Sequence, residues 1–288
     1  MTYSVSDFYK SIVLKLKALY DSEEAHAMAD RLFDHFLQLS PTRRVLSAKT
    51  VANDDKISFL EEAVNKLLQN VPLQYVLGKA YFMEMEFVVN PSVLIPRPET
   101  EELVSIILKQ YSDRQKGEQL SILDIGTGSG CIPIALKRYL PESNVSAIDI
   151  SEEALKVAVK NAAINKVEIN FFKADILDQA QSMLLPQFGL IVSNPPYVTF
   201  DEKKYMKPNV VDHEPHTALF VPNDDPLVFY REILSLAKSK LSDGGSLWFE
   251  INEKFGVELK DMAMNQGFRE VNIIFDFRGK SRFLQCFN

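Results

Sequence analysis

Apolar residues recur with two different spacings along this chain, and the change of spacing divides the chain into two parts. Over residues 1–75 they recur at intervals of three and four, the spacing that places them on one face of an α-helix. The apolar stripes are Val5, Phe8, Ile12, Leu16 and Leu19; Ala27, Leu32, Phe33, Phe36 and Leu37; Val45 and Leu46; and Ile57, Leu60, Ala63, Val64, Leu67 and Leu68. Each stripe predicts a helix packed against its neighbours, so residues 1–75 are expected to form a small helical domain. The segment holds no catalytic motif, and we therefore expect it to dock a partner.

Between residues 76 and 97 the pattern becomes that of β-structure. Residues Tyr81–Val89 alternate in the manner of a strand, and Asn90-Pro91 is a turn signal. The apolar run Val93–Pro96 fits the returning strand. We therefore predict a β-hairpin over residues 76–97 that links the helical domain to the rest of the chain.

From residue 98 to residue 288, short apolar strands alternate with helical segments, which is typical of an α/β domain built on a mostly parallel sheet. The predicted strands are Leu120–Asp124, Val145–Asp149, Glu168–Lys173, Leu190–Ser193 and Leu247–Ile251, followed by the terminal antiparallel pair Arg269–Phe275 and Arg282–Phe287. Open α/β sheets bind ligands at the carboxyl ends of their strands, so polar residues at those ends are the candidates for chemistry.

A glycine-rich loop and two acids occupy such strand ends. The run Asp124–Gly130 follows the first strand and opens a helix, and its glycines permit positive φ and the close approach of a ligand. Asp149 ends the second strand, where a carboxylate can accept both hydroxyls of a ribose. Asp175 follows the third strand and is placed to face an adenine amino group. A lone Gly-x-Gly is a weak signal, but the combination at one sheet edge predicts a binding site for an adenosine-containing cofactor.

The fourth strand leads into Asn194-Pro195-Pro196-Tyr197. The prolines fix their own φ angles, lack N–H groups and hold the preceding asparagine in an extended conformation. The result is a stiff corner that presents a side-chain amide oxygen and bare backbone carbonyls, two acceptors suited to the N–H bonds of a planar –NH2 group. Tyr197 offers a π face against which that group can lie. Alone the tetrapeptide would be read as a turn; beside the glycine loop it predicts a site for an amide or amino nitrogen.

Composition narrows the classes of function. Hydrophobic residues make up 46% and charged residues 25% of the chain, as in ordinary globular proteins. The net charge of −7 and the isoelectric point near 5.3 argue against tight, sequence-independent binding to DNA or RNA. Cys131 and Cys286 lie in apolar surroundings without metal-ligand spacing, which predicts buried thiols in a reducing cytoplasm. No signal-peptide pattern or bilayer-length apolar run is present, so we expect a cytoplasmic, metal-free monomer.

The glycine loop, the two acids and the Asn-Pro-Pro-Tyr corner together resemble the class I S-adenosylmethionine-dependent methyltransferases. The resemblance implies a Rossmann-like, mostly parallel seven-stranded sheet and S-adenosylmethionine as the cofactor. The residues implied to bind the cofactor are Gly126, Thr127, Gly128, Ser129, Gly130, Asp149, Asp175, Ile176 and Asn194. Those implied to act in catalysis are Asn194, Pro195, Pro196 and Tyr197. In such enzymes the corner marks methylation of a planar nitrogen, either the exocyclic amine of an adenine or the amide of a glutamine.

Four further segments distinguish between these two substrates. Pro72–Gly78, Leu94–Glu101, Glu214-Pro215 and Asp276–Phe283 are similar to the HemK/PrmC family, the peptide chain release factor N5-glutamine methyltransferases. The resemblance covers nearly the whole chain and implies methyl transfer to the glutamine of the Gly-Gly-Gln motif of release factors. It implies release factors as partners and no nucleic-acid substrate. The alternative, an adenine-N6 methyltransferase acting on DNA or RNA, would need a basic target-recognition unit that this acidic chain does not offer.

Other charged residues have ordinary interpretations. His213 and His216 flank Glu214 without further metal ligands, so we expect no metal site there. Arg97 is interpreted either as a brace for the cofactor pocket or as a partner of nearby glutamates. Lysines that follow the active-site strand are expected to form a solvated face; they are Lys203, Lys204 and Lys207.

Overall fold

The computed structural model describes residues 4–50, 54–112, 119–178, 180 and 185–288. The chain divides into two compact units. The helical unit comprises Met1–Gly78 together with Lys207–His213, and the sheet unit comprises Lys79–Met206 and Glu214–Asn288. The helical unit thus ends at the glycine that precedes the β-hairpin, and it includes a short segment from much later in the chain.

The helical unit is a small bundle around an apolar core. Its helices are α1 (Val5–Leu16), α2 (Ser22–Leu37), α3 (Pro41–Leu46), α4 (Asp54–Leu68), α5 (Leu73–Leu77) and α10 (Pro208–Val211). Side chains cap the first two: Ser4 accepts a hydrogen bond from the Asp7 N–H, and Asp21 accepts one from the Glu24 N–H. The buried core includes Phe8, Ile12, Leu16, Leu32, Phe33, Leu60, Val64 and Leu67, which confirms the predicted stripes of α1, α2 and α4.

The predicted burial of Val45 and Leu46 is wrong, since these side chains are 71% and 83% exposed. Helix α3 instead turns Arg44 inward. The Arg44 guanidinium lies 3.3 Å from the centre of the Tyr9 ring and pairs with Asp30 at 2.7 Å. A cation–π contact and an ion pair therefore decide the face of this short helix, and its apolar residues face solvent. Elsewhere in the stripes, Ala27 and Leu19 are also exposed.

The β-hairpin has other boundaries than predicted. Its strands are β1 (Lys79–Phe82) and β2 (Met85–Val88), so the chain turns at Met83 and Glu84, and Val93–Pro96 forms no strand. Both turn residues have positive φ, 49° and 62°, which usually calls for Asn or Gly. Tertiary hydrogen bonds hold this turn: the Met83 N–H donates to Glu101 and the Met83 carbonyl accepts from Tyr139. The local sequence carries no signal of either bond.

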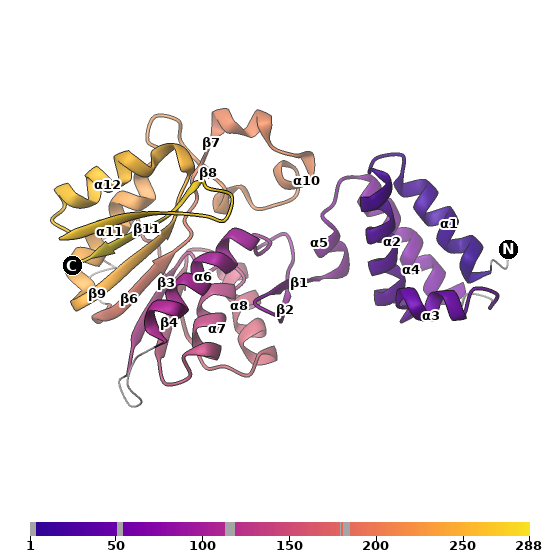
Figure 1. Cartoon of the computed structure of the whole chain (residues 1–288), viewed down its shortest axis with the longest axis horizontal. Coiled ribbons are helices and arrows are strands. Elements are labelled where there is room, and N and C mark those ends of the chain that lie inside the picture. Colours follow the sequence, from indigo (N-terminus) through magenta and orange to yellow (C-terminus); the bar gives the residue numbers. More distant parts are fainter. Residues whose placement is uncertain (1–3, 51–53, 113–118, 179, 181–184) are drawn as a thin grey trace. The chain divides into compact units, whose positions relative to one another are not determined.

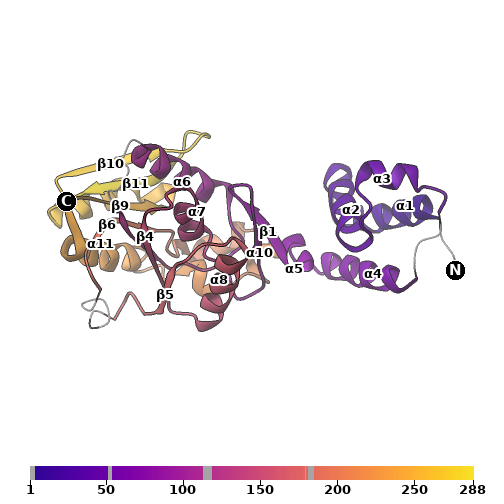
Figure 2. The ribbon, with the colours of Figure 1, turned by 90° about the horizontal axis from the view of Figure 1, so that it is seen from below.

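The sheet unit contains a seven-stranded, mostly parallel sheet, as predicted. Its strands are β3 (Ser121–Ile125), β4 (Asn144–Asp149), β5 (Asn170–Lys173), β6 (Phe188–Ser193), β9 (Leu241–Glu250), β10 (Glu270–Phe275) and β11 (Ser281–Phe287). The spatial order is β10-β11-β9-β6-β3-β4-β5, and β11 alone is antiparallel to both of its neighbours. Figure 2 shows the antiparallel pair at one edge of the sheet and β5 at the other.

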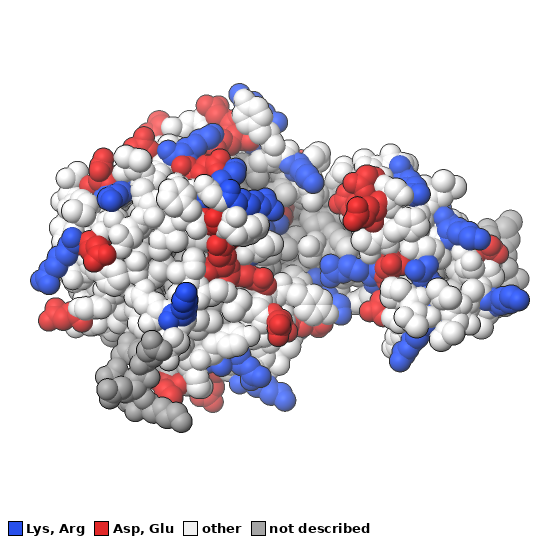
Figure 3. Space-filling model, in the orientation of Figure 1, with Lys and Arg blue, Asp and Glu red and all other residues white. Residues whose placement is uncertain are grey.

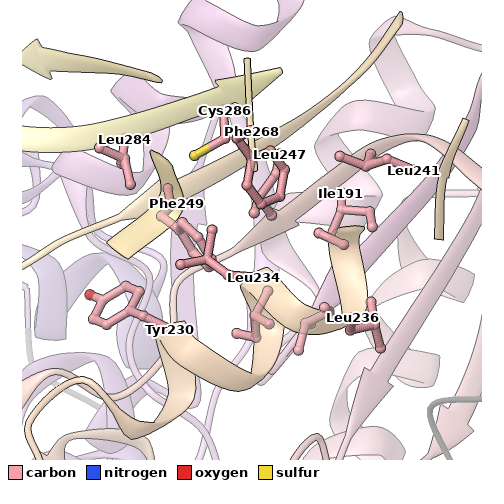
Figure 4. Packing of buried hydrophobic residues seen from close by; sticks show 14 of the residues in the cluster. Ile191, Tyr230, Leu234, Leu236, Leu241, Leu247, Phe249, Phe268, Leu284 and Cys286 are labelled. Carbon is pink, nitrogen blue, oxygen red and sulfur yellow. The ribbon is translucent and has the colours of Figure 1, made fainter. Parts of the chain in front are cut away.

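Helices cover both faces of the sheet (Figure 1). On one face lie α6 (Pro98–Tyr111), α7 (Cys131–Tyr139), α8 (Glu152–Ile164) and the hairpin; on the other lie α11 (Val228–Lys240) and α12 (Gly256–Asn265). Strand side chains alternate between the two cores: Leu247 and Phe249 pack with α11 and α12, whereas Trp248 packs on the opposite face. Figure 4 shows the first of these cores, where Tyr230 and Leu234 of α11 meet Phe249 and Leu247 of β9.

Smaller elements complete the sheet unit. They are β7 (Val198–Thr199), β8 (Phe220–Val221) and the 3₁₀ turns η1 (Phe200–Tyr205), η2 (His216–Ala218) and η3 (Glu253–Phe255). Cys131 and Cys286 are free and buried, as predicted. No helix among the described residues combines the length and the apolar composition needed to cross a bilayer.

Candidate active site

A cavity of about 360 Å³ opens at the carboxyl ends of the parallel strands. Its walls are the glycine loop after β3, the ends of β4, β5 and β6, and two covering segments, residues 92–97 and 215–220. The lining includes Gly126, Thr127, Gly128, Ser129, Asp149, Asp175, Ile176, Asn194, Pro195 and Pro196. The structure therefore brings together ten of the predicted site residues, and Gly130 and Tyr197 do not line this cavity.

The glycine loop turns sharply after β3. The N–H groups of Gly126 and Thr127 both donate to the Ile148 carbonyl of β4, at 2.9 and 3.0 Å. Gly126 and Gly128 have φ of 75° and 53°, and a Cβ added at either would meet no atom within 4 Å. A Cβ would therefore find room at both positions, and it is the left-handed backbone conformation that favours glycine there. Gly130 differs, because an added Cβ would lie 3.1 Å from the Cβ of Ala158 on α8.

Asp149 and Asp175, the two acids at strand ends, already accept hydrogen bonds from backbone N–H groups of the protein. Asp149 accepts hydrogen bonds from the N–H groups of Gly128 and Ser151, both at 2.8 Å, and burial raises its pKa against the effect of these donors. A carboxylate offers about four lone-pair sites, so these donors leave Asp149 with capacity to accept from a ligand hydroxyl. Asp175 accepts from the Leu177 N–H at 2.9 Å and lies beside Ile176 in the cavity wall.

Asp124, the first residue of the loop, is fully buried, and the predicted site did not include it. Among the described residues, neither its two carboxylate oxygens nor the Thr127 hydroxyl has a hydrogen-bond partner. Burial raises the pKa of Asp124 to about 7; the Thr127 hydroxyl, which lies near the carboxylate without good hydrogen-bond geometry, acts to lower it, and the Asp149 charge adds a smaller rise. An unpaired buried polar group costs ~1–3 kcal/mol. Thr127 lines the cavity, whereas Asp124 lies behind the lining residues.

The Asn-Pro-Pro-Tyr corner follows β6 directly. Ser193 anchors the strand end by donating to the Ile125 carbonyl at 2.7 Å. The Asn194 side-chain Nδ2 donates to the Thr100 hydroxyl of α6 at 3.2 Å. Within the described residues, no group donates to the Asn194 Oδ1 or to the Pro195 carbonyl oxygen. Two unused acceptors thus remain on residues of the cavity wall, and their role in holding an –NH2 group stays a prediction.

Tyr197 is held by hydrogen bonds at both its side-chain hydroxyl and its backbone carbonyl. Its hydroxyl donates to Glu250 Oε1 at 3.0 Å, and its carbonyl accepts from the Asn252 side chain at 3.2 Å. Burial and the Glu250 charge raise the pKa of Tyr197 well above its usual value, so the phenol stays protonated. Its proposed role as a π face for the substrate stays a prediction.

Arg97 and Glu214 join the two covering segments. The Arg97 guanidinium lies 2.6 Å from Glu214 Oε1, and the Ile95 N–H donates to Glu214 Oε2 at 3.2 Å. Arg97 lines the cavity, and the glutamate that it pairs with is distant in the sequence and not one of the nearby glutamates expected; its role as a brace for the cofactor pocket stays a prediction. Glu214 is 3% exposed, and its part in the site was not predicted. Among the described residues, no group of three His, Cys, Asp or Glu side chains is arranged to hold a metal ion.

Comparisons with known proteins agree with this geometry. Residues 9–78 match the PrmC N-terminal domain, and residues 100–213 match the methyltransferase small domain. A release factor glutamine methyltransferase of Flavobacterium psychrophilum is 40% identical over 281 residues, which is 98% of each chain. Another, from Bacteroides thetaiotaomicron, is 41% identical over 269 residues, covering 93% of this chain and 95% of the relative.

A solved structure supports the fold alone. The crystal structure of a methyltransferase from Pyrococcus furiosus superposes with a TM-score of 0.52 at 18% identity, covering 79% of this chain and 98% of that one. The fold is therefore that of the class I S-adenosylmethionine-dependent methyltransferases. With about 40% identity over almost its whole length to curated relatives, the chain belongs to the release factor glutamine methyltransferase family.

Proposed function

We propose that this protein transfers a methyl group from S-adenosylmethionine to the side-chain amide nitrogen of the glutamine in the Gly-Gly-Gln motif of peptide chain release factors. The observation that carries the proposal is the pair of unused acceptors on Asn194 and Pro195, in the wall of a cavity that the glycine loop also lines. The identification of release factors as the substrate comes from the names of the relatives.

The cavity fits the cofactor by its charge. S-adenosylmethionine carries an adenosine, a cationic sulfonium and an amino acid but no phosphate, and when bound it supplies an electrophilic methyl group. Asp149 and Asp175 stand at the wall, and Asp124 opens the glycine loop. Among the described residues that line the cavity, Arg97 is the one basic side chain, and Glu214 already pairs with it. An acidic pocket with a neutralised arginine suits a cation and would bind a pyrophosphate poorly.

Asn194 and Pro195 select and orient the amide. The Asn194 Oδ1 and the Pro195 carbonyl accept the two N–H bonds of the glutamine –NH2 group, which turns the nitrogen lone pair toward the methyl donor. An amide nitrogen is a weak nucleophile because its lone pair is delocalised, so orientation has to supply much of the rate. Holding reactants in line is worth up to ~7–11 kcal/mol. The two acceptor dipoles also stabilise the positive charge that develops on nitrogen.

No strong base is required for this reaction. Once methylated, the amide nitrogen is strongly acidic and loses its proton late. Asp149 binds the ribose in this proposal and is not free to act as a base. Glu250, the other carboxylate that could serve as a base, is buried behind the Asn-Pro-Pro-Tyr corner. The protein's part is therefore to bind, align and exclude water.

The second substrate class, an adenine-N6 amine in nucleic acid, could use the same acceptors. The charge distribution disfavours it. On the face shown in Figure 3, acidic and basic side chains are interspersed and form no basic tract. Together with the net charge of −7, this is a poor surface for a phosphate backbone.

The test is direct. The purified protein is incubated with methyl-tritiated S-adenosylmethionine and, in parallel, with a bacterial release factor, the same factor with its Gly-Gly-Gln glutamine replaced by alanine, or plasmid DNA. We expect label in the native release factor alone, and mass spectrometry should place the added methyl on the Gly-Gly-Gln peptide. Label in DNA, or equal label in the altered factor, would overturn the proposal.

A further inference from the structure

Behind Asn194 lies a chain of hydrogen bonds that joins three separate segments of the sheet unit. Asn194 Nδ2 donates to Thr100 Oγ1 at 3.2 Å. The Thr100 hydroxyl donates to Glu250 Oε2 at 2.7 Å. The Tyr197 hydroxyl donates to the other carboxylate oxygen of Glu250 at 3.0 Å. Thr100 and Glu250 are 3% and 1% exposed, so bulk water does not compete for these bonds.

The two ends of an asparagine carboxamide have nearly the same shape and opposite hydrogen-bonding character. If Oδ1 faces the cavity, Asn194 accepts an N–H bond of the substrate. If Nδ2 faces the cavity, it presents two donors to a substrate group that also donates, and the amide is repelled. Shape alone does not choose between these orientations, so catalysis depends on what lies behind the side chain.

The chain of hydrogen bonds makes this choice. Burial raises the pKa of Glu250, whereas its two hydroxyl donors and the charge of Arg282 act to lower it. In its ionised form the carboxylate can only accept, so Glu250 takes the single proton of the Thr100 hydroxyl. The protonated phenol of Tyr197 occupies the other oxygen in the same sense. Thr100 is then left with lone pairs only and must accept from Asn194. Nδ2 therefore points back to Thr100, and Oδ1 points to the cavity.

We infer that Thr100 and Glu250 are positioning residues for methyl transfer, which hold the Asn194 carboxamide with its oxygen toward the substrate. The inference rests on the proposed glutamine methylation and goes beyond it by naming what sets the polarity of the acceptor pair. Both residues act through Asn194. The same bonds explain why a threonine is buried in the first turn of α6 and a carboxylate at the end of β9.

The decisive variant is Thr100→Val, which keeps the shape of the side chain and removes the hydroxyl. We expect kcat for release-factor methylation to fall about 10- to 100-fold, since a misplaced contact near the reacting group costs that much. The KM for the release factor and the calorimetric affinity for S-adenosylmethionine should stay within about twofold. Thr100→Ser, which restores the hydroxyl, should recover most of the rate.

A matched control lies on the same helix. The Ser105 hydroxyl is exposed and donates to the Glu101 carbonyl within α6. Ser105→Ala removes a hydroxyl from α6 without touching the chain of hydrogen bonds and should leave kcat and KM unchanged. Thermal unfolding of each variant shows whether it is folded at the assay temperature.

A double-mutant comparison separates orientation from general support. Asn194→Asp carries two equivalent oxygens and has no polarity to set. Adding Thr100→Val to Asn194→Asp should therefore cost less than about twofold in kcat, compared with the 10- to 100-fold expected in the native background. An equal loss in both backgrounds would mean that Thr100 only supports the fold, and the inference would be overturned.

The outcomes also distinguish this inference from the proposed function. If the native protein methylates no glutamine, the proposed function fails first. If the native protein is active and Thr100→Val keeps its full kcat, only the positioning role fails. Should Asn194→Asp alone abolish turnover, the Val and Ser variants of Thr100 decide the question: equal activity in these two overturns the inference, and recovery in Ser supports it.

Discussion

The helical unit and the sheet unit bury different kinds of side chain. Among the described residues, every fully buried polar or charged side chain lies in the sheet unit, whereas the core of the helical unit is built from aliphatic and aromatic groups. Burying a polar group costs free energy unless it finds a partner. A domain that needs only to be stable therefore contains few buried polar side chains, whereas a domain that binds and aligns a substrate contains more of them. The contrast agrees with the position of the cavity in the sheet unit, and the docking role of the helical unit stays a prediction.

The largest effect on catalysis in the sheet unit is expected when the Asn194 side-chain acceptor at the cavity corner is removed. Asn194→Ala should lower kcat by about 10²–10³-fold, the loss seen when one preorganised polar group at a reacting centre is deleted. Binding of S-adenosylmethionine should change little, because the other cavity residues, including the glycine loop and Asp149, are left unaltered. Steady-state kinetics and calorimetric titration measure the two quantities. An equal loss of turnover and of cofactor affinity would show that Asn194 serves the cofactor and not the amide.

The second prediction concerns the unpaired carboxylate of the sheet unit. The pKa of Asp124 is raised by burial from 3.8 to about 7, so part of the cofactor-free molecules carry its proton at neutral pH. A bound cation favours the ionised form and expels that proton. Cofactor affinity should therefore rise as the pH increases toward 7 and level off above it. Calorimetric titrations at pH 7 in two buffers of different ionisation enthalpy should show proton release.

A neutral variant is the control for this titration. Asp124→Asn cannot ionise, so it should bind the cofactor about tenfold more weakly at pH 8, a loss of ~1.4 kcal/mol, and release no proton. Proton release that persists in Asp124→Asn would assign the titration to another group, with Asp149 the next candidate because burial raises its pKa as well.

Features of the fold and the site that are set by neighbouring residues can be predicted from the sequence. Contacts between residues that are far apart in the chain cannot. The strands were found because apolar runs and strand-end acids such as Asp149 are patterns of neighbouring residues. The Thr100–Glu250 and Arg97–Glu214 contacts join residues 150 and 117 positions apart, and no periodicity connects them. The rule that singled out Asp149 would also have singled out Glu250, since both acids end parallel strands. The position of Glu250 at a strand end is therefore the signal in the sequence that marks it as a site residue.

The wrong predictions have the same origin. Helix α3 was expected to bury Val45 and Leu46, but Tyr9 and Asp30, more than ten positions earlier, bind Arg44 and turn the helix. The hairpin turn at Met83 was missed because a distant glutamate and tyrosine hold a conformation that its own residues disfavour. In both places tertiary contacts override local preference.

The third prediction probes the apolar core of the helical unit. Ile12 is fully buried, and Ile12→Val removes one methylene, which should lower the free energy of unfolding by ~0.5–1.5 kcal/mol. Cofactor affinity and kcat at a temperature well below unfolding should match those of the native protein, because no residue of the helical unit lines the cavity among those described. Denaturant unfolding and calorimetry measure the two effects. A fall in cofactor affinity without unfolding would contradict the division of labour.

The smallest expected effect tests recognition by the helical unit. Leu46 is 83% exposed, although an apolar side chain gains nothing from facing water. If this unit docks the release factor, Leu46→Ser should raise KM for the intact factor about 2–5-fold, corresponding to ~0.5–1 kcal/mol of lost apolar contact, with kcat at saturation unchanged. A short peptide containing only the Gly-Gly-Gln segment is the control, since it cannot reach a second docking surface and its KM should not change. Equal shifts for factor and peptide would place the effect at the cavity, and no shift for the intact factor would remove Leu46 from the docking surface.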